Sequence, residues 1–215
     1  MFREREIGML TVHDISIRFG EERVLEHFSC EVKQGDFACI TGVSGCGKSS
    51  LLKALIGLVS IKKGKIKVGE HKLNEKTCNI IRRNVMYLPQ ELSFPSETIN
   101  DFVVYIQKVG RVKDVQKSIK TLYKNLSLLG LEKEMLDKRL SEISGGQRQR
   151  LMLATLALLD RDLWLLDEPT AALDEASRDL VIDFLLAKQK EGKTIVAVSH
   201  DTRFASHCSK LIRLG

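Results

Sequence analysis

The chain has 215 residues, of which 43% are hydrophobic and 29% charged, and its formal net charge is +6 at pH 7. This balance predicts one compact globular domain and excludes a disordered or fibrous chain. The longest near-continuous apolar run is residues 151–159, far short of the ~20 residues that cross a bilayer. Residues 1–6 are charged with mixed sign, which excludes a signal peptide and predicts a cytosolic protein. The five cysteines form no CxxC pair, so reduced thiols are expected.

The first predicted elements are strands with one buried face. Apolar and polar residues alternate over residues 10–19, and Ile66 and Val68 alternate with lysines in the stretch 61–67. Together they predict a small antiparallel sheet. The lysines suit the solvated face of a strand better than a nucleic-acid stripe, which was the alternative.

A second group of strands is short and apolar throughout. The runs at 37–40, 85–88, 163–166 and 195–198 are typical of parallel strands buried on both faces. Helical patterns separate them, so βαβ winding and an α/β fold are expected.

The middle of the chain is predicted to be helical. No strand run occurs over residues 98–159, and Ser96 or Thr98 is the expected cap of its first helix. Helical spacing is strongest in the second helix, which carries Val115, Ile119, Leu122, Leu126 and Leu129. We therefore expect one domain over residues 1–215. Residues 1–90 and 160–215 would form the core with the antiparallel part, and residues 91–159 an inserted helical subdomain.

Residues 42–49 read GVSGCGKS and match the phosphate-loop pattern GxxxxGKS directly after a predicted strand and before a helix. The glycines let backbone N–H groups and the helix N-terminus point at phosphate oxygens. A chance glycine turn is the alternative. The residues expected to bind the nucleotide here are Gly42, Val43, Ser44, Gly45, Cys46, Gly47, Lys48, Ser49 and Ser50.

Within this loop, Lys48 is expected to pair with the β and γ phosphates and Ser49 to ligate Mg²⁺. Cys46 is usually only a small residue facing the helix. If its thiolate is reachable, alkylation should block nucleotide entry.

The predicted strand at 163–166 ends in two acids. Asp167 would hold Mg²⁺ through water, and Glu168 would orient and deprotonate the attacking water. The alternative is a surface turn before Pro169.

Residues 140–150 read LSEISGGQRQR and resemble the signature motif of ATP-binding cassette (ABC) ATPases, with Ile143 where leucine is usual. The motif forms a second helix start suited to an anion, without a lysine of its own. Two chains placed head to tail would each complete the other's site. The residues expected to act across that interface are Ser144, Gly145, Gly146 and Gln147.

The resemblance extends over nearly the whole chain. Phe19, followed by Val24, is similar to the aromatic residue that stacks on adenine, and Gln90 to the glutamine that touches Mg²⁺. Asp174 ends a segment similar to the D-loop, Ala171 to Asp174, and His200 matches the switch histidine at the γ-phosphate. Taken singly, each has a structural alternative: a core aromatic, a surface glutamine or a hydrogen-bonded histidine.

The resemblance implies a P-loop NTPase core with a mainly parallel sheet, an N-terminal antiparallel β subdomain and an inserted α-helical subdomain. It implies an ATPase that uses ATP and Mg²⁺ with Glu168 and His200 as catalytic residues. The cassette would dimerise with a second copy or a paralogue around two ATP molecules. It would drive transport by integral membrane permease subunits, peripherally on the cytoplasmic face of the inner or plasma membrane.

Two other functions remain as alternatives. A soluble ABC ATPase acting on ribosomes or nucleic acid is disfavoured because the chain has one cassette and no long coiled coil, and no nucleic-acid partner is expected. A small-molecule kinase leaves Ser144 and His200 unexplained. The chain is also expected to end just after its last strand, at residues 214–215, without a C-terminal regulatory domain.

Overall fold

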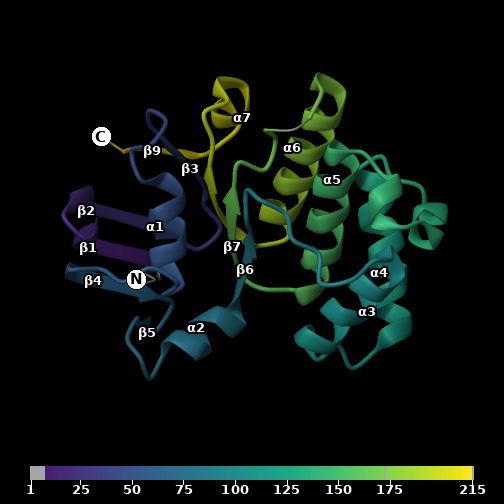
Figure 1. Cartoon of the computed structure of the whole chain (residues 1–215), viewed down its shortest axis with the longest axis horizontal. Helices are drawn as coiled ribbons and strands as arrows, with labels where there is room; N and C mark the ends of the chain where they lie inside the picture. The colour runs from purple at the N-terminus through teal and green to yellow at the C-terminus, as the bar shows by residue number, and fades with distance from the viewer. Residues whose placement is uncertain (1–7, 172, 215) are drawn as a thin grey trace, which may run out of the picture.

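The computed structural model of the chain describes residues 8–171 and 173–214. Two sheets and a set of helices make up this part of the chain (Figure 1). The charged N-terminus at residues 1–6, Ala172 of the D-loop segment and the terminal Gly215 lie outside the described residues. Among the residues that are described, no helix is long and apolar enough to cross a membrane.

The four-stranded sheet is antiparallel, as predicted, with the order β2-β1-β4-β5. Its strands are β1 (Gly8–Phe19), β2 (Glu22–Lys33), β4 (Lys63–Val68) and β5 (His71–Lys72). Lys63, Lys65 and Lys67 are exposed on β4 while Ile66 and Val68 are buried, which confirms the solvated strand face.

Strand β1 departs from the expected alternation at both its middle and its end. Val12 and Ile15 are both buried because a β-bulge lies between them, where Asp14 has a φ of 49°. Phe19 was expected on the buried face, and this was wrong: 50% of its surface is exposed. The strand runs past the core at this point, so its last ring projects into solvent.

The five-stranded sheet is parallel, with the order β6-β7-β8-β3-β9. The four predicted apolar runs are confirmed as strands, and β9 lies where a last strand was expected, just before residues 214–215, although no range was predicted for it. The bounds are β3 (Phe37–Thr41), β6 (Val85–Leu88), β7 (Leu163–Asp167), β8 (Thr194–Val198) and β9 (Lys210–Arg213). The carboxyl ends of all five strands share one edge, where open α/β sheets bind ligands.

Helices cover both faces of the parallel sheet, so β3, β6, β7 and β8 are buried on both sides, whereas the edge strand β9 has one buried residue. One hydrophobic cluster joins the sheet to α1 and the antiparallel sheet, and the other joins it to α6, α7 and the middle helices. The bounds are α1 (Lys48–Leu55), α2 (Cys78–Asn84), α6 (Glu175–Lys190) and α7 (Thr202–Ser206).

The described residues from Thr98 to Leu159 contain helices and no strand, as predicted, apart from one isolated bridge between Thr98 and Arg139. Thr98 is the cap of α3, since its side chain accepts a hydrogen bond from the Asp101 N–H. The elements are α3 (Ile99–Gly110), α4 (Val115–Leu128), η1 (Lys133–Asp137), η2 (Leu140–Glu142), α5 (Gly145–Leu156) and η3 (Ala157–Leu159).

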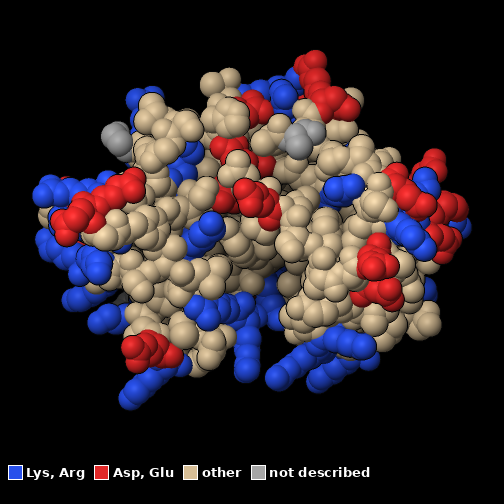
Figure 2. Space-filling view, in the orientation of Figure 1, with Lys and Arg blue, Asp and Glu red and all other residues tan. Residues whose placement is uncertain are grey.

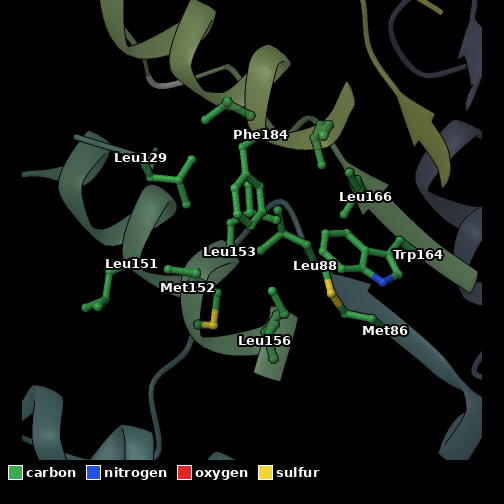
Figure 3. Close-up of a cluster of buried hydrophobic side chains, with 14 of the residues drawn as sticks. Met86, Leu88, Leu129, Leu151, Met152, Leu153, Leu156, Trp164, Leu166 and Phe184 are labelled. Carbon is green, nitrogen blue, oxygen red and sulfur yellow. The ribbon is translucent and has the colours of Figure 1, made fainter. Parts of the chain in front are cut away.

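The expected apolar stripe of α4 is only partly buried. Leu122, Leu126 and Leu129 are in the core, but Val115 is 48% exposed because it opens the helix at the periphery. The core beneath is drawn in Figure 3, where Trp164 of β7 and Phe184 of α6 pack with ring centroids 6.3 Å apart. Leucines and methionines of α5 and β6 complete it, so the helices and the parallel sheet share one core.

Surface charge is unevenly placed in this view. Figure 2 shows Lys and Arg side chains gathered along the lower margin, beneath α2 and α3 in the orientation of Figure 1. The carboxyl edge of the parallel sheet lies on the opposite, upper side, where the phosphate-loop pattern is found.

Candidate functional site

A cavity of about 430 Å³ opens at the carboxyl edge of the parallel sheet and reaches the end of the β1–β2 hairpin. It brings together most of the residues singled out in the sequence, from segments that are far apart in the chain. Its lining consists of Phe19, Glu22, Val24, Ser44, Gly45, Gly47, Lys48, Ser49, Ser50, Gln90, Glu168, Val198 and His200. Glu22 and Val198 are the members that no motif predicted.

The glycine-rich loop joins β3 to α1 and starts the helix at Lys48. Gly47, the N-cap, has a φ of 92° and offers no side chain to the first N–H groups of α1. A Cβ at Gly47 would lie 2.7 Å from Val24 Cγ1, and one at Gly42 would lie 2.5 Å from the Leu214 carbonyl oxygen. The loop therefore needs glycine at both positions, and its helix start is left open for an anion.

Lys48 is 9% exposed and its ammonium lies inside the loop. The Nζ atom donates to the carbonyl oxygens of Gly42, at 2.9 Å, and Val43, at 2.8 Å. Cys46 Sγ lies 3.9 Å from the same Nζ. A positive charge thus stands inside the loop, held by two of its carbonyl oxygens.

Ser49 and Asp167 meet although 118 positions separate them: the Ser49 hydroxyl donates to Asp167 Oδ1 at 3.0 Å. Asp167 is 1% exposed, and burial raises the pKa of its carboxyl above the usual value, with the nearby Glu168 acting in the same direction. A hydroxyl and a carboxylate are oxygen ligands of the kind that Mg²⁺ prefers. Nucleotide sites often hold Mg²⁺ with one or two such side chains plus phosphates, so the residues present fit this ion.

Glu168 follows Asp167 and faces the cavity with an unusual backbone, since its φ is 51° before Pro169. The Glu168 N–H donates to the Val198 carbonyl at 3.0 Å, and the Glu168 carbonyl accepts from Gln149 Nε2 at 2.9 Å. Such conformations cost about 1–3 kcal/mol and persist where the surroundings hold them. The carboxylate is thereby fixed in direction.

The Glu168 carboxylate has one partner. His200 Nδ1 lies 2.9 Å from Oε1, while Oε2 is buried with no hydrogen-bond partner among residues 8–171 and 173–214. An unpartnered buried acceptor is costly, about 1–3 kcal/mol. Glu168 also lines the cavity, so its carboxylate is the group that can accept a proton from a water placed there.

The remaining site predictions lie around this centre or apart from it. Gln90 follows β6 and is exposed at the cavity wall, and Val24 lies against Gly47. Gly42, Val43, Cys46 and Asp167 belong to the loop and strand end without lining the cavity.

The signature residues lie apart from the cavity. Ser144 is the N-cap of α5 and accepts from the Gln147 N–H, while Gln147 Oε1 accepts from the Ser144 N–H. Gly145 and Gly146 form the first turn. None of the four lines the cavity of its own chain, so their action across an interface stays a prediction.

Asp174 of the D-loop segment also lies apart from the cavity and caps α6. Its carboxylate accepts a hydrogen bond from the Ser177 N–H at 2.7 Å, and this bond holds the pKa of Asp174 below its usual value. A structural role at the helix start is therefore visible, whereas a role at the nucleotide stays a prediction.

Comparison with known proteins adds family likeness to this geometry. The family model described as ABC transporter matches residues 25–171. A zinc transport system ATP-binding protein of Streptococcus pneumoniae is 31% identical over 201 residues, which is 89% of this chain and 83% of that protein. A putative ABC transporter ATP-binding protein of Treponema denticola is 31% identical over 217 residues, 95% of this chain and 43% of that protein.

The chain thus spans less than half the length of some relatives that it matches, including a carnitine transport ATP-binding protein of Listeria monocytogenes at 46%. Among solved structures, a dimeric ATP-binding cassette in a post-hydrolysis state bound to ADP and Pi is similar. Its TM-score is 0.85 at 26% identity, and the likeness covers 96% of this chain and 94% of that one.

Proposed function

The chain belongs to the ABC transporter family, and on this premise we propose that it is the ATP-binding and ATP-hydrolysing subunit of a transporter. One observation carries the proposal: the Lys48 loop, the Ser49–Asp167 pair and the Glu168–His200 pair meet at the carboxyl edge of one sheet. These parts together supply what phosphoryl transfer to water requires, namely positioning of the phosphates and of the nucleophile.

In the proposed mechanism the loop and the start of α1 hold the phosphates, and Lys48 turns its ammonium to the β and γ phosphates. Ser49, Asp167 and Gln90 would hold Mg²⁺. When bound, this ion offsets negative charge that develops on the phosphates during transfer. Burial raises the pKa of Asp167, and such a cation would lower it again because a nearby positive charge favours the carboxylate form.

Glu168 is the proposed general base. Its carboxylate lines the cavity and would accept the proton of the attacking water, while His200 holds Oε1 and faces the γ-phosphate. Phe19 would stack on the base and Val24 would pack against the sugar. All of these groups line or adjoin one cavity, so no large rearrangement within the chain is needed to bring them to the nucleotide.

The four signature residues of one copy would complete the site of a second copy. The solved cassette that resembles this chain is a dimer, which supports a dimer here. In the head-to-tail arrangement that we propose, the γ-phosphate connects Lys48 and His200 of one copy with Ser144 and Gly146 of the other. Loss of that phosphate removes the connection, so hydrolysis reopens the dimer. D-loop Asp174 would lie at the same interface.

The permease partners and the place of action are proposals of the same kind. We place the chain at the cytoplasmic face of the inner or plasma membrane, with the segment 90–99 as the contact for membrane subunits. The relatives are named as transporter ATP-binding proteins. Their names do not favour the alternative of a soluble ATPase on ribosomes or nucleic acid.

The test is co-purification. A tagged Glu168→Gln form is expressed in the native cell, membranes are solubilised in mild detergent with ATP present, and the proteins that co-purify are identified. Recovery of a multi-span membrane protein is expected. A matched Lys48→Ala form, which should not bind ATP, controls for adventitious association. Recovery of ribosomes or nucleic acid without a membrane partner would overturn the transporter function and leave the ATPase chemistry in place.

A further inference from the structure

Glu22 lines the same cavity as Phe19 although no sequence motif includes it. It opens β2 and is the register partner of Phe19, the last residue of β1, across a two-residue turn. Register partners of an antiparallel pair point to the same face, with Cβ atoms about 4.5–5.5 Å apart. The carboxylate of Glu22 therefore stands beside the ring proposed to stack on the base.

The position of Val24 shows which part of a bound nucleotide would lie beside Glu22. Val24 packs against the phosphate loop, since a Cβ on Gly47 would lie 2.7 Å from its Cγ1 atom. Glu22 is two residues farther along the strand, which is about 7 Å at the usual rise per residue. A nucleotide with its phosphates in the loop thus passes its sugar along Val24 and presents its base at the level of Phe19 and Glu22.

The charge of Glu22 is not neutralised. Among the described residues, the carboxylate of Glu22 has no hydrogen bond or ion pair, whereas the neighbouring Arg18 and Arg23 both contact Glu26. A free carboxylate near a polyanionic nucleotide weakens binding unless it makes a specific contact. An ionised carboxylate only accepts hydrogen bonds, so the base edge that fits it is one that presents a donor, and in adenine that donor is the 6-amino group.

We propose that Glu22 is a specificity-determining residue of the nucleotide site, whose carboxylate accepts a hydrogen bond from the 6-amino group of adenine. A purine with a 6-oxo group has an acceptor at that position and carries its donor, the N1–H, one ring position away, so it is disfavoured. This inference rests on the proposed ATP site and adds to it the choice of base. Phe19 supplies stacking, which every purine shares, and Glu22 supplies the distinction.

The experiment compares ATP with inosine triphosphate, which differs by the 6-oxo group and the N1–H, through displacement of a ribose-labelled fluorescent ATP. We expect the unmodified chain to bind ATP roughly 10-fold more tightly, the effect of one hydrogen bond to a charged group. In Glu22→Gln the ratio of the two dissociation constants should fall close to 1, because an amide can donate to the oxo group as well as accept from the amino group.

Glu21→Gln is the matched control. It removes the same charge one residue away, but Glu21 lies in the turn and lines a different cavity, with Arg18 and His27. Its preference for ATP should remain roughly 10-fold.

Two results would overturn the role of Glu22: an unchanged preference in Glu22→Gln, or an equal gain in affinity for both nucleotides, which would make the carboxylate a repulsive charge only. Failure of the unmodified chain to bind either nucleotide would overturn the proposed function itself.

Discussion

The imidazole of His200 meets the carboxylate of Glu168 at 2.9 Å, between Nδ1 and Oε1, and leaves Oε2 buried without a partner. His200 has 70% of its side chain exposed, whereas Glu168 has only 9%. The histidine therefore reaches from the surface to a carboxylate whose backbone is already fixed. His200 therefore holds the carboxylate that we propose as the general base.

Glu168→Gln should retain ATP binding and lose hydrolysis. The amide has the same shape and tolerates the same backbone, but it is not a base, so the rate of phosphate release should fall about 10²- to 10⁴-fold. A stable dimer should then accumulate in the presence of ATP, and light scattering after gel filtration measures it. A monomer at saturating ATP would contradict the head-to-tail dimer, and an unchanged melting temperature controls for folding.

His200→Ala should slow hydrolysis more than it weakens binding. Without the imidazole, Oε1 loses its partner and the carboxylate is free to turn, and misplacement of this kind costs up to about 100-fold in rate. His200→Gln, which keeps a hydrogen-bonding group, should recover part of kcat with little change in KM. If the alanine and glutamine forms were equally slow, positioning of Glu168 by His200 would not be its role.

Asp167→Asn should make the nucleotide-free chain more stable near neutral pH. Burial raises the pKa of Asp167 above its unfolded value, so its ionised form is disfavoured in the folded state. Stability from this group is therefore lost as pH rises from about 4 through the raised pKa. Asparagine removes that loss and still accepts from Ser49, so the melting temperature should rise by a few degrees at pH 7. It should be unchanged or lower at pH 4.

The same variant should lose the Mg²⁺ dependence of nucleotide binding, because an amide oxygen is a weaker ligand than a carboxylate. Titration of fluorescent ATP with and without Mg²⁺ measures this. A variant that binds Mg²⁺–ATP as the unmodified chain does would contradict the proposed role of Asp167.

Alkylation of Cys46 should block nucleotide binding. The Sγ atom lies 3.9 Å from Lys48 Nζ, so an attached maleimide would crowd the lysine and the loop that are proposed to hold the phosphates. Bound ATP should protect the thiol. Because four other cysteines are present, Cys46→Ala is the control: it should bind ATP and stay active after the same treatment. Persisting ATPase activity after complete labelling of Cys46 would contradict the expectation.

Gly47→Ala should destabilise the fold and prevent nucleotide binding. Its φ of 92° strains an alanine by about 1–2 kcal/mol, and its Cβ would clash with Val24 at 2.7 Å. Gly192→Ala is a matched control, since Gly192 has a φ of 93° and no atom within 4 Å of the added Cβ. Urea unfolding should show Gly47→Ala to be the less stable by about 1–3 kcal/mol, the usual cost of overpacking. Equal losses would show that Val24 moves aside.

Local sequence patterns predicted much of the fold. The phosphate loop has its strand and its helix within the same 19 residues, from Phe37 to Leu55, so the motif and its setting are read together. The buried parallel strands are equally recognisable because they are apolar throughout. In both cases the signal lies within one short stretch.

No range was predicted for strands β2, β5 and β9, and for β2 and β9 the physical reason is visible. His27 has a φ of 53° and interrupts β2, so Leu25 and Val32 are buried out of phase and no period of two survives. Strand β9 has one buried residue, Ile212, and is recognised only through its pairing with β3. Irregular and edge strands depend on partners that a sequence pattern does not contain.

The site shows the same division. Asp167 and Glu168 were predicted from the strand that they end, but Glu22 has no motif and matters only because the hairpin places it opposite Phe19. The turn at Gly20 was a usable signal, since pairing residues across it leads to Glu22. Sheet order decided the rest: β8 separates β3 from β7, and only the assembled sheet brings Ser49 to Asp167.

The two carbonyl contacts of Lys48 bear on turnover. An ammonium that already donates to Gly42 and Val43 must exchange these bonds for phosphate oxygens, so the arrival of a nucleotide is a swap of partners. Departure is the reverse swap: the released lysine returns to its own loop and never stands unpaired. In the proposed ATPase cycle, this exchange lowers the affinity for the product, and each cycle ends with the loop in the shape in which it began.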